Sequence, residues 1–306
     1  MGKCNVEMTV DELFSWLLYF PVRNAVLATG GNPAVVKRVA GLTAELECRV
    51  FGKRNSDFEN YLAGMFQGTL LEGREKEIVR KCIRLRHRCF LARLTLVKSS
   101  TAPPLRNGEY LDIVGDRGGC FPTVHFGFFF SAFSALAANV SIPVYITSLM
   151  KDSPSRIKRK CTRIKKETLN SLGIVPIYNR GQFVAEVMPL VADRKACYCP
   201  TFDIVSKKSK CYPFLGGKLV LSIEPSARFA MKTGIPIFPY FTLGDGVDSH
   251  RIVIEKPLDP SGEADSLGAI EERYLSILEK YVSLYPDMVD WFYWWKRLEN
   301  FTPPPK

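Results

Sequence analysis

The sequence predicts an α/β protein with a mixed, largely parallel central sheet flanked by helices and preceded by a helical N-terminal region. Three observations support this class. Apolar residues recur at helical spacing through the first hundred residues. Short strand patterns then alternate with helical ones, which is typical of parallel sheets, and no internal repeat interrupts them. We therefore expect a helical region over residues 1–100, packed on the core, and an α/β domain over 101–306.

The N-terminal region begins with a capping-box pattern, in which Thr9 precedes Glu12 by three positions. An aromatic run over residues 14–20 follows, and it either docks on lipid or packs on the helices after it. Further helices are expected at 33–51, 57–67 and 74–97, the last of them strongly basic.

The α/β region starts after Pro103-Pro104 and Asn107-Gly108, which break the helical pattern. Strands are expected at 109–114, 120–125, 142–146, 173–178, 196–199, 218–222, 236–243 and 251–255. Helices are expected at 128–138, 154–172, 182–188, 225–233 and 264–281, with an aromatic helix within the tail at 284–297. That last helix either forms a membrane belt or packs against the sheet.

Net charge and cysteine content indicate the kind of partner and the cellular compartment of the protein. A formal net charge of +11 on 306 residues favours an anionic partner, such as a phospholipid surface, a phosphorylated carrier or RNA. Nine cysteines without regular spacing, and no signal-like start, indicate a reduced cytoplasmic location. The apolar stretch 13–27 is interrupted by Pro21, Arg23 and Asn24, so we expect no membrane span, although peripheral attachment to the inner face stays open.

The most informative stretch is residues 123–131, where an expected strand ends at His125 and an aromatic helix begins. Histidine takes and returns a proton near neutral pH, and in α/β sheets sites form at the carboxyl ends of strands. His125 is therefore a candidate general base, with a buried structural histidine as the alternative. His87 and His250 are expected at the surface.

Several short motifs follow His125-Phe126-Gly127 in a recognisable order. They are Pro200-Thr201-Phe202-Asp203, Pro213-Phe214-Leu215-Gly216, the small-residue segment 225–230, Thr233-Gly234-Ile235-Pro236, and Tyr285-Pro286 with Trp291 and Trp295. This order resembles the late lipid A acyltransferase family, the lauroyl and myristoyl acyltransferases, together with the related phosphatidylinositol mannoside acyltransferases. The resemblance implies a glycerolipid-acyltransferase-like fold, no cofactor, and an acyl carrier protein or coenzyme A thioester as donor.

The chain departs from the family at the residue that should support the histidine. In the family an Asp or Glu follows the histidine after four residues and orients its ring, whereas this chain has Phe130 there. The site is then inactive, or served by another carboxylate, or used on an acceptor that is easier to deprotonate. Asp203 is the first candidate replacement and Glu224 the second. Their structural alternatives are an Asx turn for Asp203 and a helix-start carboxylate for Glu224.

Two further groups of residues are candidates for substrate binding. An aromatic wall next to the base would shape the pocket, through Phe126, Gly127, Phe128, Phe129 and Phe130. A basic helix would bind an acidic carrier, a lipid headgroup or an RNA backbone through Arg156, Lys158, Arg159 and Arg163. The structural alternative is that this face of the helix is simply solvated.

The expected function is acyl transfer from a thioester to a hydroxyl or amine, with His125 as base. Two alternatives stay open: aminoacyl transfer from aminoacyl-tRNA or a carrier-bound amino acid, and a non-catalytic protein that binds lipid or carrier. Cys197, Cys199 and Cys211 have no fourth ligand at zinc spacing, so no metal is expected. No Gly-x-Ser-x-Gly motif is present, which disfavours a serine hydrolase.

Overall fold

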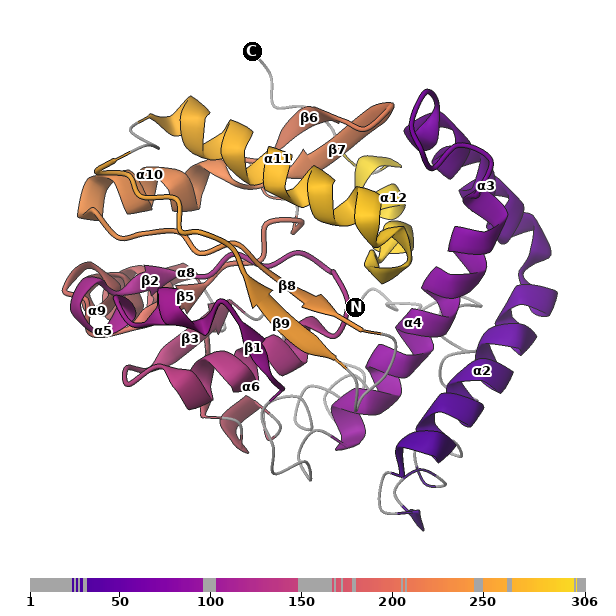
Figure 1. The fold of residues 1–306 in the computed structure, drawn as a ribbon, viewed down its shortest axis with the longest axis horizontal. Coiled ribbons are helices and arrows are strands. Elements are labelled where there is room, and N and C mark those ends of the chain that lie inside the picture. The colour runs from indigo at the N-terminus through magenta and orange to yellow at the C-terminus, as the bar shows by residue number, and fades with distance from the viewer. Residues whose placement is uncertain are drawn as a thin grey trace, which may run out of the picture.

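The computed structural model describes residues 24, 26, 28, 29, 32–95, 103–147, 167, 169–171, 173–177, 180–204, 206, 208–244, 250–262, 266–299 and 301. It is a mixed α/β structure in which a parallel sheet is flanked by helices, as predicted (Figure 1). Three helices within residues 32–95 form a layer along one side of it. No helix in this described part of the chain is both long and apolar enough to cross a bilayer.

The helical layer consists of α2 (Pro33–Val50), α3 (Gly52–Phe66) and α4 (Glu75–Thr95). The Asn32 side chain caps α2 by accepting a hydrogen bond from the backbone N–H of Ala34 at 2.9 Å. Phe51 both ends α2 and opens α3, so α3 begins five residues before the expected start at 57. The three predicted helices are otherwise confirmed.

The main sheet has four parallel strands in the order β2-β5-β3-β4: β2 (Gly119–Cys120), β5 (Cys197–Cys199), β3 (Val144–Thr147) and β4 (Ile174–Ile177). A second sheet has the order β1-β9-β8: β1 (Leu105–Arg106), β9 (Arg251–Ile254) and β8 (Tyr240–Leu243). A parallel bridge between Cys120 and Ile237 joins the two sheets. Because only β8 and β9 pair antiparallel within these sheets, the joined sheet is mixed and largely parallel.

Helices cover the joined sheet on both faces. In Figure 1, α6 (Phe129–Asn139) lies below the strands, and α10 (Glu224–Thr233) and α11 (Leu267–Leu284) lie above them. Further helical segments in the described residues are η2 (Gly108–Leu111), α5 (Val114–Arg117), α8 (Arg180–Gln182), the π-helical turn η3 (Phe183–Val187), α9 (Met188–Ala192), η4 (Pro286–Met288) and α12 (Trp291–Glu299). Of the expected helix 154–172, only residues 167 and 169–171 are described, and they are helical.

Two predicted strands are corrected by the structure. Residues 109–114 are helical because Asn107 adopts a left-handed conformation, with φ of 59°, and turns the chain into η2. The expected strand at 120–125 is regular only as β2, although an isolated parallel bridge between Thr123 and Thr201 continues its direction. The structure also adds an antiparallel hairpin of β6 (Lys210–Phe214) and β7 (Gly217–Leu221), of which only the second strand was predicted.

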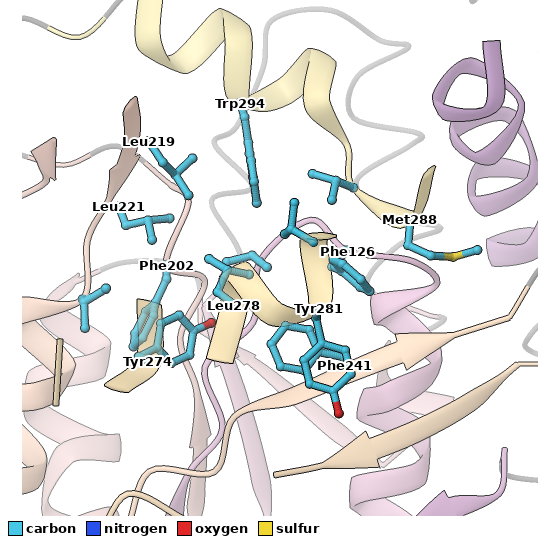
Figure 2. Packing of buried hydrophobic residues seen from close by; sticks show 14 of the residues in the cluster. Phe126, Phe202, Leu219, Leu221, Phe241, Tyr274, Leu278, Tyr281, Met288 and Trp294 are labelled. Atoms are coloured by element: carbon cyan, nitrogen blue, oxygen red, sulfur yellow. The ribbon is translucent and has the colours of Figure 1, made fainter. Parts of the chain in front are cut away.

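A large apolar cluster lies between the joined sheet, α11 and α12, and Figure 2 shows its rings gathered around Leu278. Phe241 of β8 stacks on Tyr281 of α11 with ring centroids 3.9 Å apart. Phe202 meets Tyr274 edge to face at 4.9 Å. Because Phe202 directly precedes Asp203, this packing fixes the loop on which Asp203 stands.

Candidate functional site

His125 stands in a tight turn between β2 and α6. Gly127 has φ of +56°, and a Cβ atom at this position would lie 2.2 Å from the carbonyl oxygen of Thr242. Its N–H donates to the carbonyl of Met288 at 2.6 Å. Only glycine suits this close approach, so the turn holds the backbone next to His125 in one conformation.

The parallel bridge between Thr123 and Thr201 explains why Asp203 meets His125. Each of the two residues lies two positions beyond a bridged threonine. The bridge places the two segments side by side, so the short turns that follow the two threonines, one with His125 and the other with Asp203, begin next to each other. The bond from the Phe202 N–H to the Thr123 carbonyl, at 2.8 Å, continues this pairing.

The Asp203 carboxylate is in contact with both the ring and the backbone of His125. Oδ1 lies 2.9 Å from the imidazole Nδ1, and Oδ2 accepts the His125 backbone N–H at 2.7 Å. Oδ2 also accepts the indole N–H of Trp294 at 2.8 Å. Because the carboxylate accepts at Nδ1, the neutral ring carries its proton there and leaves Nε2 as the atom that can accept another.

Asp203 is 1% exposed, yet its surroundings favour the ionised form. Burial by itself raises the pKa of this carboxyl. The charge of His125 and the hydrogen bonds from His125 and Trp294 outweigh that effect and lower the pKa below its ordinary value. A carboxylate that is ionised near neutral pH therefore lies behind the imidazole.

Two aromatic rings hold the imidazole in place. Tyr293 of α12 stacks on it, with centroids 4.0 Å apart and planes 27° apart. Phe129, the first residue of α6, meets it edge on at 4.9 Å. The His125 side chain keeps 20% of its surface exposed, so a proton donor from solution can reach it. This arrangement has the parts of a general base: an oriented ring, an ionised partner and an accessible edge.

The second candidate carboxylate, Glu224, is placed elsewhere. It begins α10 and forms ion pairs with Lys210 at 2.9 Å and Arg228 at 2.8 Å. Its role is the helix-start carboxylate that was the structural alternative. Of the two candidates, the structure therefore brings only Asp203 against the His125 ring.

The aromatic wall is only partly in contact with the base. Phe126 and Phe128 are buried in the core, where Phe126 packs edge on against Phe241 and Phe128 stacks on His250. Phe129 is the wall residue that touches the imidazole. Phe130 lies in α6, and its side chain is outside the described part of the structure.

The basic helix cannot be compared with its prediction, because Arg156, Lys158, Arg159 and Arg163 lie outside the described residues. The basic helix α4 does pass beside the site. The Cys89 thiol there donates to the carbonyl of Gly127 at 3.3 Å.

Of the other two histidines, both expected at the surface, His250 was wrongly placed and His87 is only partly exposed. His87 is half-buried and pairs with Glu47 of α2 at 2.6 Å. His250 is buried against the Phe128 ring. Their flanking residues are polar, and the sequence offered no sign of the distant partners that cover them.

The contributions of Tyr293 and Trp294 were missed by sequence reasoning. Residues 291–295 are all aromatic, so nothing in the local pattern distinguishes a ring that packs from one that touches a functional group. No group of three or more His, Cys, Asp or Glu side chains arranged for a metal ion occurs among the described residues. Burial raises the pKa of Cys197 to about 12, so this thiol stays protonated.

Comparison with known proteins adds no assignment: no protein-family model and no curated protein matches this chain.

Proposed function

We propose that this protein is an acyltransferase that moves an acyl group from a thioester to a hydroxyl or amine acceptor, with His125 as general base. One observation carries the proposal: the Asp203 carboxylate lies 2.9 Å from His125 Nδ1 and is buried, ionised and tied to α12. Asp203 supplies the orienting carboxylate that the resemblance to the late lipid A acyltransferases leads one to expect and that Phe130 cannot supply.

The chemistry follows from the two nitrogens of the ring. Nδ1–H is held by Asp203, so Nε2 accepts the proton of the acceptor O–H or N–H while the acceptor atom bonds to the acyl carbon. The carbonyl electron pair moves onto oxygen to give a tetrahedral oxyanion. Collapse of this intermediate breaks the carbon–sulfur bond, and the thiolate leaves with the proton returned from His125. No covalent enzyme intermediate is required.

Asp203 contributes in two ways. It fixes the tautomer that exposes Nε2, and its negative charge stabilises the imidazolium formed when the proton arrives. Because its carboxylate also accepts the His125 backbone N–H, ring and main chain are held by one group. The non-catalytic alternative, a protein that only binds lipid or carrier, was based on the absence of an acid at Phe130. Because Asp203 takes the place of that acid, the geometry supports a catalytic protein instead.

The test is a transfer assay with dodecanoyl-coenzyme A and dodecanoyl-acyl carrier protein as donors and a polar lipid extract as acceptor. Acceptor-dependent thiol release by the wild type is expected, and His125→Ala should abolish it. His87→Ala is the matched control, since it removes the other histidine that pairs with a buried carboxylate. Both variants should keep the wild-type circular dichroism spectrum.

A parallel arm uses radiolabelled aminoacyl-tRNA in place of the thioesters. Ribonuclease-sensitive transfer in that arm alone would replace the thioester donor by aminoacyl-tRNA. Wild-type turnover in His125→Ala, or no transfer by the wild type from any of these donors, overturns the proposal.

A further inference from the structure

We propose that the Tyr293 hydroxyl donates a hydrogen bond to the oxyanion that forms during this transfer, with Arg297 polarising it. The inference rests on the proposed function and assigns a second catalytic group to the same site. No sequence pattern distinguished Tyr293, but its ring stacks on the His125 imidazole and its oxygen accepts a hydrogen bond from Arg297.

The Tyr293 ring is fixed against the base by more than stacking. Its centroid lies 4.0 Å from that of His125. The backbone N–H of Asp290 donates to the His125 carbonyl at 2.8 Å, and the Asp290 side chain accepts the backbone N–H of Tyr293 at 3.1 Å. The start of α12 is therefore tied to the main chain of His125, so phenol and imidazole form one rigid unit.

The Tyr293 hydroxyl oxygen already accepts one hydrogen bond, whereas its proton is available for donation. Arg297 Nη2, one helical turn later, donates to the phenol oxygen at 2.8 Å. Because the oxygen accepts there, its own O–H must point to another acceptor. No acceptor for that proton occurs among the residues that the structure describes. An incoming carbonyl oxygen would supply one.

The guanidinium of Arg297 also makes this hydroxyl a stronger donor. Its central carbon lies 4.5 Å from the Tyr293 ring centroid. A cation at this distance draws electron density from the phenol and strengthens its O–H as a hydrogen-bond donor.

The protonated state of the Tyr293 phenol allows it to act as a hydrogen-bond donor and not as a general base. Burial raises the pKa of its phenol to about 12, and the Asp203 charge adds to this rise while Arg297 opposes it. The phenol is therefore protonated across the pH range in which a histidine base works. It can share a proton with an oxyanion without losing it.

His125 and Tyr293 together stabilise the tetrahedral step: His125 accepts the proton of the acceptor, and Tyr293 donates a hydrogen bond to the oxyanion. Nε2 of His125 takes the acceptor proton, and the acceptor atom bonds to the acyl carbon. The carbonyl electron pair then rests on oxygen, where the Tyr293 O–H meets it. When the thiolate leaves, this pair re-forms the carbonyl and Tyr293 keeps its own proton. Donors fixed in advance at such an oxygen act mainly on kcat.

The experiment compares Tyr293→Phe with Arg297→Met in the dodecanoyl-thioester assay described above. Tyr293→Phe keeps the ring that stacks on His125 and removes only the hydroxyl. It should lower kcat roughly 100-fold, the usual loss for one oxyanion donor, with the donor KM nearly unchanged. Arg297→Met removes the polarising cation but leaves the O–H, so its loss in kcat should be clearly smaller.

Tyr61→Phe is the matched control. Tyr61 stacks on Trp295 of the same helix α12, and its variant should keep wild-type kcat. Equal losses in Tyr293→Phe and Arg297→Met would show that only their mutual bond matters, and would overturn the inference. Wild-type kcat in Tyr293→Phe, beside an inactive His125→Ala, would overturn the inference and leave the proposed function standing. Wild-type turnover in His125→Ala would instead remove the proposed function itself.

Discussion

Two histidine–carboxylate pairs in the described part of the chain look alike in isolation. His125 Nδ1 lies 2.9 Å from Asp203 in the α/β part, and His87 Nε2 lies 2.6 Å from Glu47 in the helical layer. Both histidine side chains are 20% exposed, and the carboxylate side chains are 1% and 7% exposed. Distance and burial therefore do not distinguish a site from a structural pair.

The partners of the two carboxylates do distinguish them. Glu47 also binds Arg54 at 2.6 Å and Arg86 at 3.7 Å, so two permanent cations already neutralise it. The further donors to Asp203, in the described structure, are neutral: the His125 backbone N–H and the Trp294 indole. A proton arriving on His125 meets a carboxylate whose charge is otherwise uncompensated, and that is the condition under which a carboxylate assists a base.

The largest expected effect comes from Asp203→Asn. The amide keeps the size of the side chain but removes the charge and can hold the wrong tautomer of the ring. In a histidine-containing triad the same change lowers kcat by roughly 10⁴-fold, and we expect a loss of that order in acyl transfer. Steady-state kinetics of the thioester assay would measure it.

Glu47→Gln makes the same chemical change at the other pair and is the control for Asp203→Asn. Its kcat per folded molecule should stay at the wild-type value. Similar losses in the two variants would mean that the comparison between the pairs is wrong, and that both act only through the fold.

Glu47→Gln should instead affect stability. Burial raises the pKa of Glu47, but the His87 hydrogen bond and the Arg86, His87 and Arg54 charges lower it to about 2, from an ordinary 4.5. Removing one partner of a buried ion pair costs about 3–5 kcal/mol, because the cations left behind are uncompensated. Urea unfolding near neutral pH would show the loss as a lower midpoint.

The pH dependence of this loss follows from the direction of the pKa change. The folded-state pKa of Glu47 is depressed, so its contribution is fully present above about pH 4.5 and disappears as the pH falls through about 2. The stability difference between wild type and Glu47→Gln should therefore shrink on acidification. A difference that stays constant between neutral pH and pH 2 would contradict this account.

The sequence could predict one of these two pairs and not the other. The α/β class follows from alternating patterns, and His125 and Asp203 follow from co-linear motifs that a parallel sheet brings into register. The contact of Glu47 with His87 joins two helices through side-chain packing, and no local pattern encodes it. Tyr293 and Trp294 were missed for a similar reason, since the direction of each ring in an aromatic helix depends on where the helix docks.

The smallest of these effects, in Trp294→Phe, tests whether neutral donors matter to Asp203. The variant keeps an aromatic ring in the core and removes the indole N–H that donates to Oδ2 at 2.8 Å. Hydrogen bonds to charged groups contribute about 1.5–3 kcal/mol. We therefore expect the variant to lose about this much in total, partly as a lower free energy of unfolding and partly as a higher activation free energy, which lowers kcat. Without this donor the pKa of Asp203 rises, and the acidic limb of the kcat profile should move toward neutral pH.

Trp291→Phe separates this role from packing. Trp291 is equally buried in α12, but its indole donates to the backbone carbonyl of Pro286, a neutral acceptor, at 2.6 Å. Its variant should lose stability while keeping the wild-type kcat profile, because Asp203 keeps all its donors. If both tryptophan variants shift the acidic limb equally, the indole of Trp294 acts only by holding α12 in place. A shift in Trp294→Phe alone would show that neutral donors keep Asp203 ionised and leave its charge for His125.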